Sequence, residues 1–469
     1  MVIIPAGVEG APAKAPEGAW RPPTVGVELA GFAAQNTQVS RRAVMVGALV
    51  ATGSAACTGG SATGSAGGRL LLRGTTLPDG RRADVLLDQG KIAAIGGDAG
   101  GADGLDLAGY LLLPSGVETH AHLDKAFLGR RVPNPAGDLA GAIEVMSAIA
   151  PTMTDEDVRE RASRGIELAV RHGYTAIRTH VDVNARNGTR PLKVLLDLRQ
   201  QYADIVDLQV VAFVGPVSGA AGAGARALLD EGLRLGADVV GGLPYADPDP
   251  AQAVREYLAA AKEYGRLVDL HTDETTDASV LSLRELIAET ARAGMGGKVA
   301  ASHCVSLGQQ DPENAALVAK DAAAAGVAVI TLPQTNLYLQ GREGGVLVPR
   351  GLTAIDALRR AGAVLAGGGD NWRDPFNAVG RADPFEIASL LVAAGHLDTA
   401  AAYAAVSDQA RTVLNLPPVG LRPGDPAELL AIRAADLDEA VAGATEDRAV
   451  FHRGRLVART QVTTALHRA

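Results

Sequence analysis

The stretch that decides the fold runs from Thr154 to Val183 and reads "TDEDVRERASRGIELAVRHG" followed by "YTAIRTHVDV". Its first part has helical periodicity, starts after the capping residue Thr154 and stops at Gly173. Its second part is a short apolar run that predicts a buried strand over 175–183. A helix that leads directly into an apolar strand is the repeating unit of an α/β fold.

The same alternation continues in both directions from this unit. Strand–helix alternation repeated eight times is the signature of a (β/α)8 barrel. Active sites of such barrels gather at the C-terminal ends of the strands, so functional side chains are expected there. The other predicted strands are 111–122, 206–215, 238–245, 267–274, 298–307, 327–336 and 364–372, and a further helix is predicted before Gly265, within 249–265.

Short runs typical of β-strands lie on both sides of the barrel region. Residues 68–97 contain such runs, separated by Pro-Asp-Gly and Asp-Gln-Gly turns, and 426–434 and 448–459 form a matching set. The two sets can pair into one small sheet domain. We therefore predict an α/β protein in which a (β/α)8 TIM barrel carries a small β-sandwich formed from both termini. The domains are the barrel over 115–415 and the two sandwich parts over 68–114 and 416–469.

Residues 1–67 are interpreted as a disordered N-terminus with an export signal and a linker. Residues 1–40 are rich in Pro, Gly and Ala without periodicity, and Arg41 and Arg42 then precede a moderately apolar run. Small residues stand before Cys57, as in a twin-arginine signal, and the Gly/Ser-rich stretch that follows is typical of a flexible linker. This pattern predicts export to the periplasm or the extracellular space. A cytoplasmic location stays open, because an Ala-rich linker or an early start codon gives the same pattern.

The composition argues against several classes of protein. The chain has 469 residues and a formal net charge of -9, which argues against a nucleic-acid-binding surface. Its two cysteines, Cys57 and Cys304, have no CxxC partner, so a disulfide framework is not expected. The body of the chain has no segment long and apolar enough to predict a membrane span in the mature protein. A homo-oligomer stays open.

Unusual polar residues fall at the predicted strand ends. Five of the nine histidines are among them. Because the C-terminal strand ends of a barrel meet at one mouth, the set is more informative than any single member. The set is His120 and His122 at the first strand, His180 and Asp182 at the second, His271, Asp273 and Glu274 at the fifth, His303 at the sixth, Asn336 at the seventh and Asp370 at the eighth.

The stretch "VETHAHLDKAF", residues 117–127, places His120 and His122 one residue apart. Residues i and i+2 of a strand point to the same face, so both imidazoles can share one ion. His271 and Asp370 reach the same mouth from other strands. Three imidazoles and a carboxylate predict a site for one divalent metal ion, zinc or iron, with a position left open for water. Such an ion lowers the pKa of the water towards neutrality.

Two further residues are candidates for catalysis. Glu274 follows His271 by three residues and is expected to carry protons between the nucleophile and the leaving nitrogen. The alternative for Glu274 is an acid at a helix N-terminus, favoured by the helix dipole. His303 is expected to orient the hydroxide or to stabilise negative charge on the substrate, with a buried structural histidine as the alternative. His180 either holds other ligands in place or is structural.

Taken together, the motifs resemble the cytosine deaminase-like branch of the amidohydrolase superfamily. They are "THAHLDKAF", "RTHVDV", "GGLPY", "LHTDET", "ASHC", "TNLYLQGR" and "GGGDNWRDPFNAVG", and they keep the family's order from about Gly68 to the C-terminus. The resemblance implies the barrel with its terminal sandwich. Relatives with two metals use a lysine in strand four, which "ADVVGGLPY" lacks, so one metal is favoured. The implied roles are metal ligation by His120, His122, His271 and Asp370, proton transfer by Glu274 and a place beside the hydroxide for His303.

Departures from the family pattern concern the substrate. Gly215 stands where cytosine deaminases have a glutamine that reads the pyrimidine edge. Asn371 replaces the carboxylate that follows the last metal ligand, whereas Phe376 keeps an expected aromatic ring. Lys125 is expected to bind substrate or to hold its loop. Because a site built around an amide discriminates strongly, cytosine is not the expected substrate, and Gly215 makes room for a larger one.

The predicted function is metal-dependent hydrolysis of a C–N bond, a deamination, in a cyclic amidine or nitrogen heterocycle. The expected partner is a small heterocyclic substrate. One alternative is an amidohydrolase that acts on an N-substituted amino heterocycle or a cyclic amide, as in triazine-degrading and hydantoin-type relatives. The other is an inactive exported binding protein, against which the complete metal set and Glu274 argue.

Overall fold

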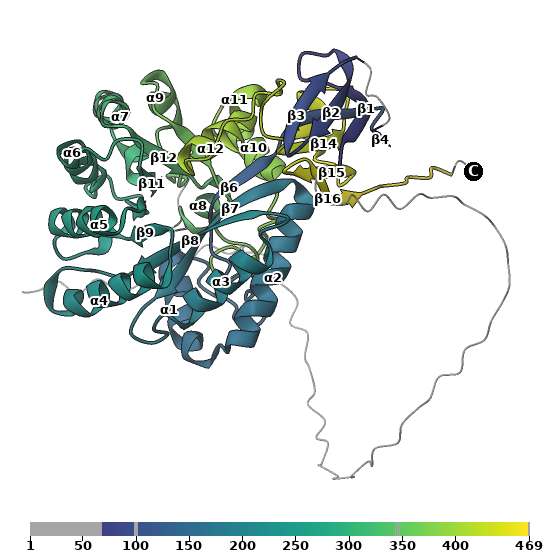
Figure 1. Cartoon of the computed structure of the whole chain (residues 1–469). Coiled ribbons are helices and arrows are strands. Elements are labelled where there is room, and N and C mark those ends of the chain that lie inside the picture. The colour runs from purple at the N-terminus through teal and green to yellow at the C-terminus, as the bar shows by residue number, and fades with distance from the viewer. Residues whose placement is uncertain (1–67, 98–101, 343, 345, 347, 468–469) are drawn as a thin grey trace, which may run out of the picture. The chain divides into compact units, whose positions relative to one another are not determined.

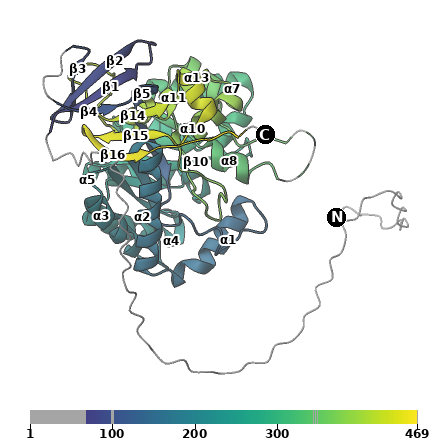
Figure 2. The same ribbon diagram turned by 90° about the vertical axis from the view of Figure 1, so that its right-hand side faces the viewer.

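The computed structural model describes residues 68–97, 102–342, 344, 346 and 348–467. The predicted disordered N-terminus, its export signal and its linker lie outside these residues. The described part contains two eight-stranded sheets, a parallel barrel sheet and a small sheet built from both ends of the chain (Figures 1 and 2). Within this part, no helix is long and apolar enough to cross a membrane.

The parallel sheet is the predicted (β/α)8 barrel. Each strand pairs in parallel with the next one along the chain. The barrel closes between its first and last strands, where His122 N donates to Asp370 O at 3.1 Å and Asp370 N donates to His120 O at 2.7 Å. The strands are β6 (Gly116–Ala121), β7 (Tyr174–Val183), β8 (Asp207–Val214), β9 (Val239–Gly242), β10 (Leu267–Thr272), β11 (Val299–His303), β12 (Val327–Thr331) and β13 (Leu365–Gly367).

Helices follow the strands and cover the outside of the barrel (Figure 1). The α-helices of the barrel region are α1 (Leu139–Ile149), α2 (Asp155–His172), α3 (Arg190–Gln201), α4 (Gly219–Leu235), α5 (Pro250–Tyr264), α6 (Leu283–Ala293), α7 (Pro312–Ala325), α8 (Pro333–Leu339), α9 (Ile355–Arg360), α10 (Pro384–Ala393), α11 (Thr399–Ala405) and α12 (Asp408–Val413). Short 3-10 helices occupy Ala150–Thr152, Pro244–Ala246 and Val305–Gln309, and α13 (Leu437–Gly443) lies in the C-terminal part.

Helix α2 begins and ends where the sequence predicts. The Thr154 hydroxyl accepts from Asp157 N at 3.2 Å, which satisfies one of the free N–H groups of the first turn. Gly173 ends the helix at a φ of 108°, a conformation that glycine adopts without steric cost. Its buried residues recur at helical spacing and pack into the barrel core; they include Val158, Ala162, Ile166 and Ala169.

The small sheet joins the two ends of the chain, as predicted. Strand β5 (Tyr110–Pro114) pairs antiparallel with β14 (Leu429–Arg433), so N-terminal and C-terminal strands share one sheet. Its own core includes Leu72, Ile92 and Phe451, all fully buried. The other strands are β1 (Leu70–Thr76), β2 (Arg82–Asp88), β3 (Lys91–Ile95), β4 (Asp103–Asp106), β15 (Arg448–His452) and β16 (Arg455–Thr460).

Several predicted strands are longer than the observed ones, and 111–122 and 327–336 are examples. The run 111–122 is not one strand, because β5 ends at Pro114 and β6 begins at Gly116. The chain changes partner there, since β5 pairs with β14 whereas β6 pairs with β7. The run 327–336 ends as a strand at Thr331, because Pro333 starts α8, which carries Asn336. An apolar run does not show where its pairing partner changes.

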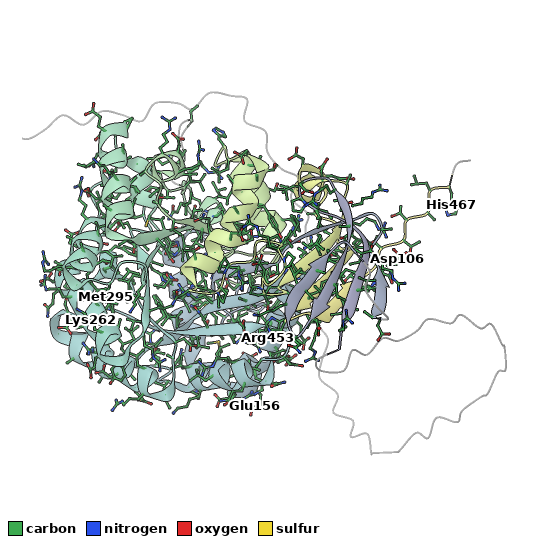
Figure 3. The ribbon with its side chains drawn as sticks, turned by 45° about the horizontal axis from the view of Figure 1, so that its top comes forward. Asp106, Glu156, Lys262, Met295, Arg453 and His467 are labelled. Carbon is green, nitrogen blue, oxygen red and sulfur yellow. The ribbon has the colours of Figure 1, made fainter. Side chains whose placement is uncertain are left out.

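Two ion pairs connect the small sheet to the barrel. Arg448 on β15 makes a bidentate contact with Asp383, the residue that caps α10, with Nη1–Oδ1 and Nη2–Oδ2 distances of 3.0 and 2.9 Å. These side chains are only 0% and 8% exposed. Arg453, labelled in Figure 3 beside the small sheet, pairs with Asp207 at the start of β8. The small sheet is therefore fixed to the barrel by ion pairs as well as by the direct chain connection from β5 to β6.

Candidate metal centre and active site

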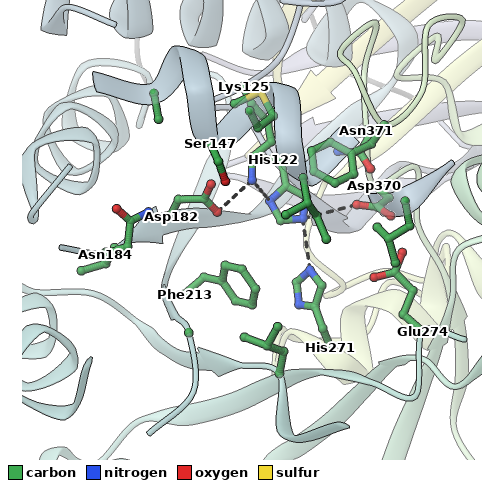
Figure 4. A pocket seen from close by; sticks show the side chains of 18 of the residues that line it. His122, Lys125, Ser147, Asp182, Asn184, Phe213, His271, Glu274, Asp370 and Asn371 are labelled. Carbon is green, nitrogen blue, oxygen red and sulfur yellow. Dashed lines mark hydrogen bonds and ion pairs between the residues drawn. The ribbon is translucent and has the colours of Figure 1, made fainter. Parts of the chain in front are cut away.

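A cavity of about 260 Å³ opens at the C-terminal ends of the barrel strands (Figure 4). All four predicted substrate-binding residues line it, namely Lys125, Gly215, Asn371 and Phe376. Of the predicted ligands and catalytic residues, His122, His271, Glu274 and Asp370 line it as well. His120 and His303 are buried beside these residues. The C-terminal ends of the barrel strands thus bring the predicted residues together, whereas the chemical roles of these residues stay predictions.

The four predicted metal ligands converge in the barrel mouth. The Asp370 Oδ1 atom lies 3.7 Å from His120 Nε2 and 3.3 Å from His122 Nε2. His271 Nε2 lies 3.2 Å from His122 Nε2. Ligand atoms of His120, His122 and Asp370 all lie within 4.8 Å of one another, close enough to hold one ion.

The chemistry of these donors fits a divalent metal. Within the described part of the chain, His120 Nε2, which faces Asp370 Oδ1, is buried without a hydrogen-bond partner, which is costly unless another group binds there. Burial lowers the pKa of His120, His122 and His271 well below the ordinary 6.5, so their imidazoles are neutral and keep a lone pair. Neutral imidazoles with one carboxylate are donors that zinc and divalent iron accept.

Two residues of the site have a left-handed backbone. His303, the last residue of β11, has a φ of 70°, and Asp370, three residues after the end of β13, has a φ of 60°. A non-glycine residue in this region costs on the order of 1–3 kcal/mol and persists only where the surroundings hold it. The hydrogen bonds of barrel closure hold Asp370, and Cys304 N, which donates to Thr272 O at 2.8 Å, holds the turn after His303. The fold therefore strains the chain at two candidate site residues.

Glu274, which lines the cavity, lies beside the buried His303. His303 Nδ1 is 3.5 Å from Glu274 Oε1, and Asn336 Nδ2 is 3.1 Å from the same nitrogen. Burial raises the pKa of Glu274 to about 8, although a hydrogen bond from Tyr245 and the charge of Lys125 oppose the shift. Helix α6 begins only at Leu283, so Glu274 is not an acid of its first turn. The carboxylate is instead part of the cavity wall.

Asp273, the neighbour of Glu274, has a different place. Its Oδ1 atom accepts from Ser282 N at 2.9 Å and its Oδ2 atom from Leu283 N at 3.0 Å. The Asp273 carboxylate therefore fixes the loop between β10 and the start of α6 by hydrogen bonds. Of the two acids that follow His271, only Glu274 lines the cavity.

Lys125 is buried beside the proposed ligands. Its Nζ atom donates to Asp182 Oδ1 at 2.8 Å and lies 3.3 Å from His122 Nδ1 (Figure 4). Burial opposes the charge, but Asp124 and Asp182 more than offset this effect, and the pKa of Lys125 is raised. The lysine is a permanent cation that ties the first loop to the end of β7.

Gly215 leaves one wall of the cavity open. A Cβ atom added at this position would meet no atom within 4 Å. Its carbonyl accepts from Tyr257 OH at 3.1 Å, so the backbone is fixed although no side chain fills the space. Phe213, two residues earlier, lines the cavity with its ring centroid 4.3 Å from that of His271. The open space lies where the sequence resemblance placed a missing glutamine.

Asn371 and Phe376 belong to one loop that Asp374 organises. Asn371 Nδ2 donates to Asp374 Oδ2 at 2.9 Å, and Phe376 N donates to Asp374 Oδ1 at 2.8 Å. The Asn371 amide is therefore partly occupied within its own loop. Sequence reasoning did not single out Asp374, because its role depends on the folded shape of the loop.

Helix α1 forms a wall of the cavity that the sequence interpretation missed. It contributes Leu139, Ile143, Met146 and Ser147 to the lining, and Ile143 is 50% exposed at its edge. Arg186, from the loop after β7, also lines the cavity and donates to Ser147 O at 3.2 Å. The sequence does contain a signal for this helix. Asp138 is a favoured N-cap residue before an apolar run, and its side chain accepts a hydrogen bond from Gly141 N.

Comparisons with known proteins agree on the kind of protein to which this chain is similar. The model of the Amidohydrolase family matches residues 134–458. A pterin deaminase from Rhizobium rhizogenes is 34% identical over 361 residues, which covers 76% of this chain and 82% of the relative.

Two solved structures extend this result to the fold. The structure of 5-methylcytosine deaminase from Klebsiella pneumoniae with 5-fluorocytosine has a TM-score of 0.77 at 30% identity and covers 85% of this chain and 99% of its own. The structure of N-isopropylammelide isopropylaminohydrolase from Burkholderia multivorans has a TM-score of 0.73 at 32% identity and covers 84% of this chain and 98% of its own.

Proposed function

The chain belongs to the amidohydrolase family, and from this premise we propose that it hydrolyses a C–N bond of a nitrogen heterocycle and releases ammonia or a small amine. One observation carries the proposal. His120, His122 and Asp370 bring donor atoms within 4.8 Å of one another, and His271 Nε2 lies 3.2 Å from His122 Nε2, next to a cavity that Glu274 also lines. Such an arrangement suits hydrolysis rather than mere ligand binding, because a proton-transfer group stands beside the metal donors.

We propose one divalent ion, zinc or iron, as the cofactor. His120, His122, His271 and Asp370 would hold it. Strand β9, with the sequence Val-Val-Gly-Gly, offers no lysine for a second ion. When bound, such an ion acts as a Lewis acid and lowers the pKa of water into the neutral range.

Glu274 and His303 are proposed to handle the protons of the reaction. Ionised Glu274 takes a proton from the attacking water and passes it to the nitrogen that leaves, so the C–O bond forms and the C–N bond breaks with protons in balance. Burial disfavours this ionised form, and the positive charge of a divalent ion held by the neighbouring residues would favour it. Asn336 donates its amide N–H to His303 Nδ1, which leaves the proton of the neutral imidazole on Nε2. From there it can stabilise negative charge that develops on the substrate.

The substrate is proposed to be larger than a single pyrimidine ring. The open space at Gly215 supports this, and so does the likeness to a pterin deaminase, whose name points to a fused two-ring substrate. Cytosine fits less well, because the position that would carry a recognition amide has no side chain. An N-substituted amino heterocycle is the second candidate, favoured by the 32% identity to N-isopropylammelide isopropylaminohydrolase.

Metal-loaded protein and a substrate panel test the proposal. Pterin, cytosine, 5-methylcytosine and N-isopropylammelide are incubated with the protein, and ammonia and isopropylamine are measured separately. We expect ammonia from pterin and little from cytosine. Release of isopropylamine alone would support the second candidate, and rapid turnover of cytosine would refute the argument from Gly215. A metal-loaded protein that turns over none of them would favour the exported binding protein.

Glu274→Gln is the matched catalytic variant. It keeps the size of the side chain and removes the proton-accepting carboxylate, so turnover should fall about 10²–10⁴-fold while the bound metal stays at the wild-type amount. Elemental analysis checks the metal, and a steady-state assay checks the rate. Wild-type turnover in this variant would remove Glu274 from the mechanism.

Export by a twin-arginine signal is proposed for the localisation. The support is Arg41 and Arg42 before a moderately apolar run. Replacing both arginines by lysine should retain the protein in the cytoplasm, as measured by cell fractionation. Equal export of the wild type and this variant would contradict the proposal.

A further inference from the structure

A second layer of buried polar residues lies below the proposed metal ligands. Asp269 precedes His271 by two residues on β10, so both side chains point to the same face of the barrel sheet. Ser302 stands on β11 in register with His271, and Arg178 and His180 come from β7. All of Arg178, His180, Asp269 and Ser302 are 0% exposed. Neither the sequence motifs nor the proposed reaction gives Asp269 or Ser302 a role.

The hydrogen bonds of this layer fix the positions of its protons. Arg178 Nη1 donates to Asp269 Oδ2 at 2.8 Å, and this pairing keeps Asp269 as a carboxylate that can only accept. Ser302 Oγ lies 2.6 Å from Asp269 Oδ1, so the hydroxyl proton of Ser302 points to Asp269. The lone pairs of Ser302 Oγ are then left for its other neighbour.

That neighbour is His120, whose Nδ1 atom lies 2.9 Å from Ser302 Oγ. Because the Ser302 hydroxyl already donates its hydrogen bond to Asp269 Oδ1, His120 Nδ1 must be the donor of this second bond. The proton of the imidazole therefore resides on Nδ1, and Nε2 keeps its lone pair. Among the described residues, Nε2 has no hydrogen-bond partner, and it lies 3.7 Å from Asp370 Oδ1.

The same carboxylate also reaches the ring that packs on His120. His180 stacks on His120 with ring centroids 3.8 Å apart and an interplanar angle of 24°. The Nε2 atom of His180 lies 3.5 Å from Asp269 Oδ2. Asp269 thus contacts both Ser302, which accepts the hydrogen bond from His120, and His180, whose stacked ring limits rotation of His120.

We propose that Asp269 is a positioning residue of the metal centre. Through Ser302 it fixes His120 in the tautomer protonated on Nδ1 and holds Nε2 ready to bind the metal. A ligating histidine whose other nitrogen donates to a fixed acceptor is a better and better-oriented ligand. The inference rests on the proposed metal site but is independent of the substrate.

Ser302→Ala is the most direct test. It removes only the hydroxyl that links His120 to Asp269 and leaves the Arg178–Asp269 ion pair in place. We expect the affinity for Zn²⁺, measured by competition with a chelator, to fall about 10–100-fold. Ser115→Ala is the matched control, since Ser115 is equally buried and its hydroxyl bonds Thr175 Oγ1 at 2.6 Å before the first barrel strand. Wild-type Zn²⁺ affinity in Ser302→Ala would overturn the proposal.

The tautomer of His120 gives a second readout that needs no variant. Long-range ¹H–¹⁵N NMR of metal-free protein labelled at histidine should show His120 protonated on Nδ1. Protonation on Nε2 in the wild type would overturn the proposal even if Ser302→Ala did not fold. Neither readout uses turnover. Failure to hydrolyse any heterocycle would therefore refute the proposed function and leave the positioning role standing.

Discussion

Asp383→Asn should destabilise the whole folded chain through one buried charge. Arg448 is 0% exposed at its side chain and loses its only carboxylate partner among the described residues in this variant. Removing one partner of a buried pair costs about 3–5 kcal/mol, because the remaining charge is left uncompensated. Asparagine keeps the N-cap of α10, where Phe385 N now bonds Asp383 Oδ1 at 3.0 Å, so we expect a loss near the lower end, about 3 kcal/mol.

Urea unfolding followed by circular dichroism measures this loss. Asp197→Asn is the control, since Asp197 pairs with Arg159 at the surface with side chains 66% and 41% exposed. Such a pair contributes about 0–1 kcal/mol, so the control should unfold close to the wild type. Replacing both partners by apolar residues, Asp383→Leu with Arg448→Met, should recover much of the loss. A loss below about 1 kcal/mol for Asp383→Asn would refute the reasoning about this buried pair.

Three further outcomes follow from the structure. Hydrogen bonds from Arg131 lower the pKa of Asp157 to about 2 from the ordinary 3.8, so its contribution to stability is full above about pH 4 and is lost as the pH falls towards 2. Because Asp157 is partly exposed, the wild type should exceed Asp157→Asn by only about 1 kcal/mol near neutral pH, and a gap in unfolding free energy that stays constant on acidification would contradict this. Gly215→Gln should lower kcat/KM for a two-ring substrate about 10–100-fold while a one-ring substrate is spared, because the new side chain enters open space; equal losses on both would contradict the size argument. Removing metal with a chelator should abolish turnover and lower the melting temperature, and added Zn²⁺ or Fe²⁺ should restore both; full activity without bound metal would exclude the proposed cofactor.

The barrel was predictable because its local signals agree with one another. Caps such as Thr154 and Gly173 mark α2, and the apolar run that follows marks β7. The errors at 111–122 and 327–336 have one physical cause. Apolar periodicity reports burial, and burial continues through a change of sheet or the start of a helix.

The candidate site was predictable as far as strand ends determine it. His120, His271 and Asp370 meet because parallel strands deliver their C-terminal ends to one mouth. The contact between Ser302 and His120 was not predictable, because it depends on the register of strands far apart in the sequence. The wall formed by α1 depends on how a loop folds back over the barrel, which local patterns do not specify.

The pairing of β5 with β14 has a consequence for the order in which the protein is made. Strand β5 leads through Ser115 directly into β6, which ends at the two histidines of the first motif. Its partner β14 leaves the ribosome only after the whole barrel sequence has been synthesised. The nascent chain therefore waits with an open sheet edge beside its first barrel strand, and a chain that stops before Leu429 would keep that edge exposed for aggregation or chaperone binding.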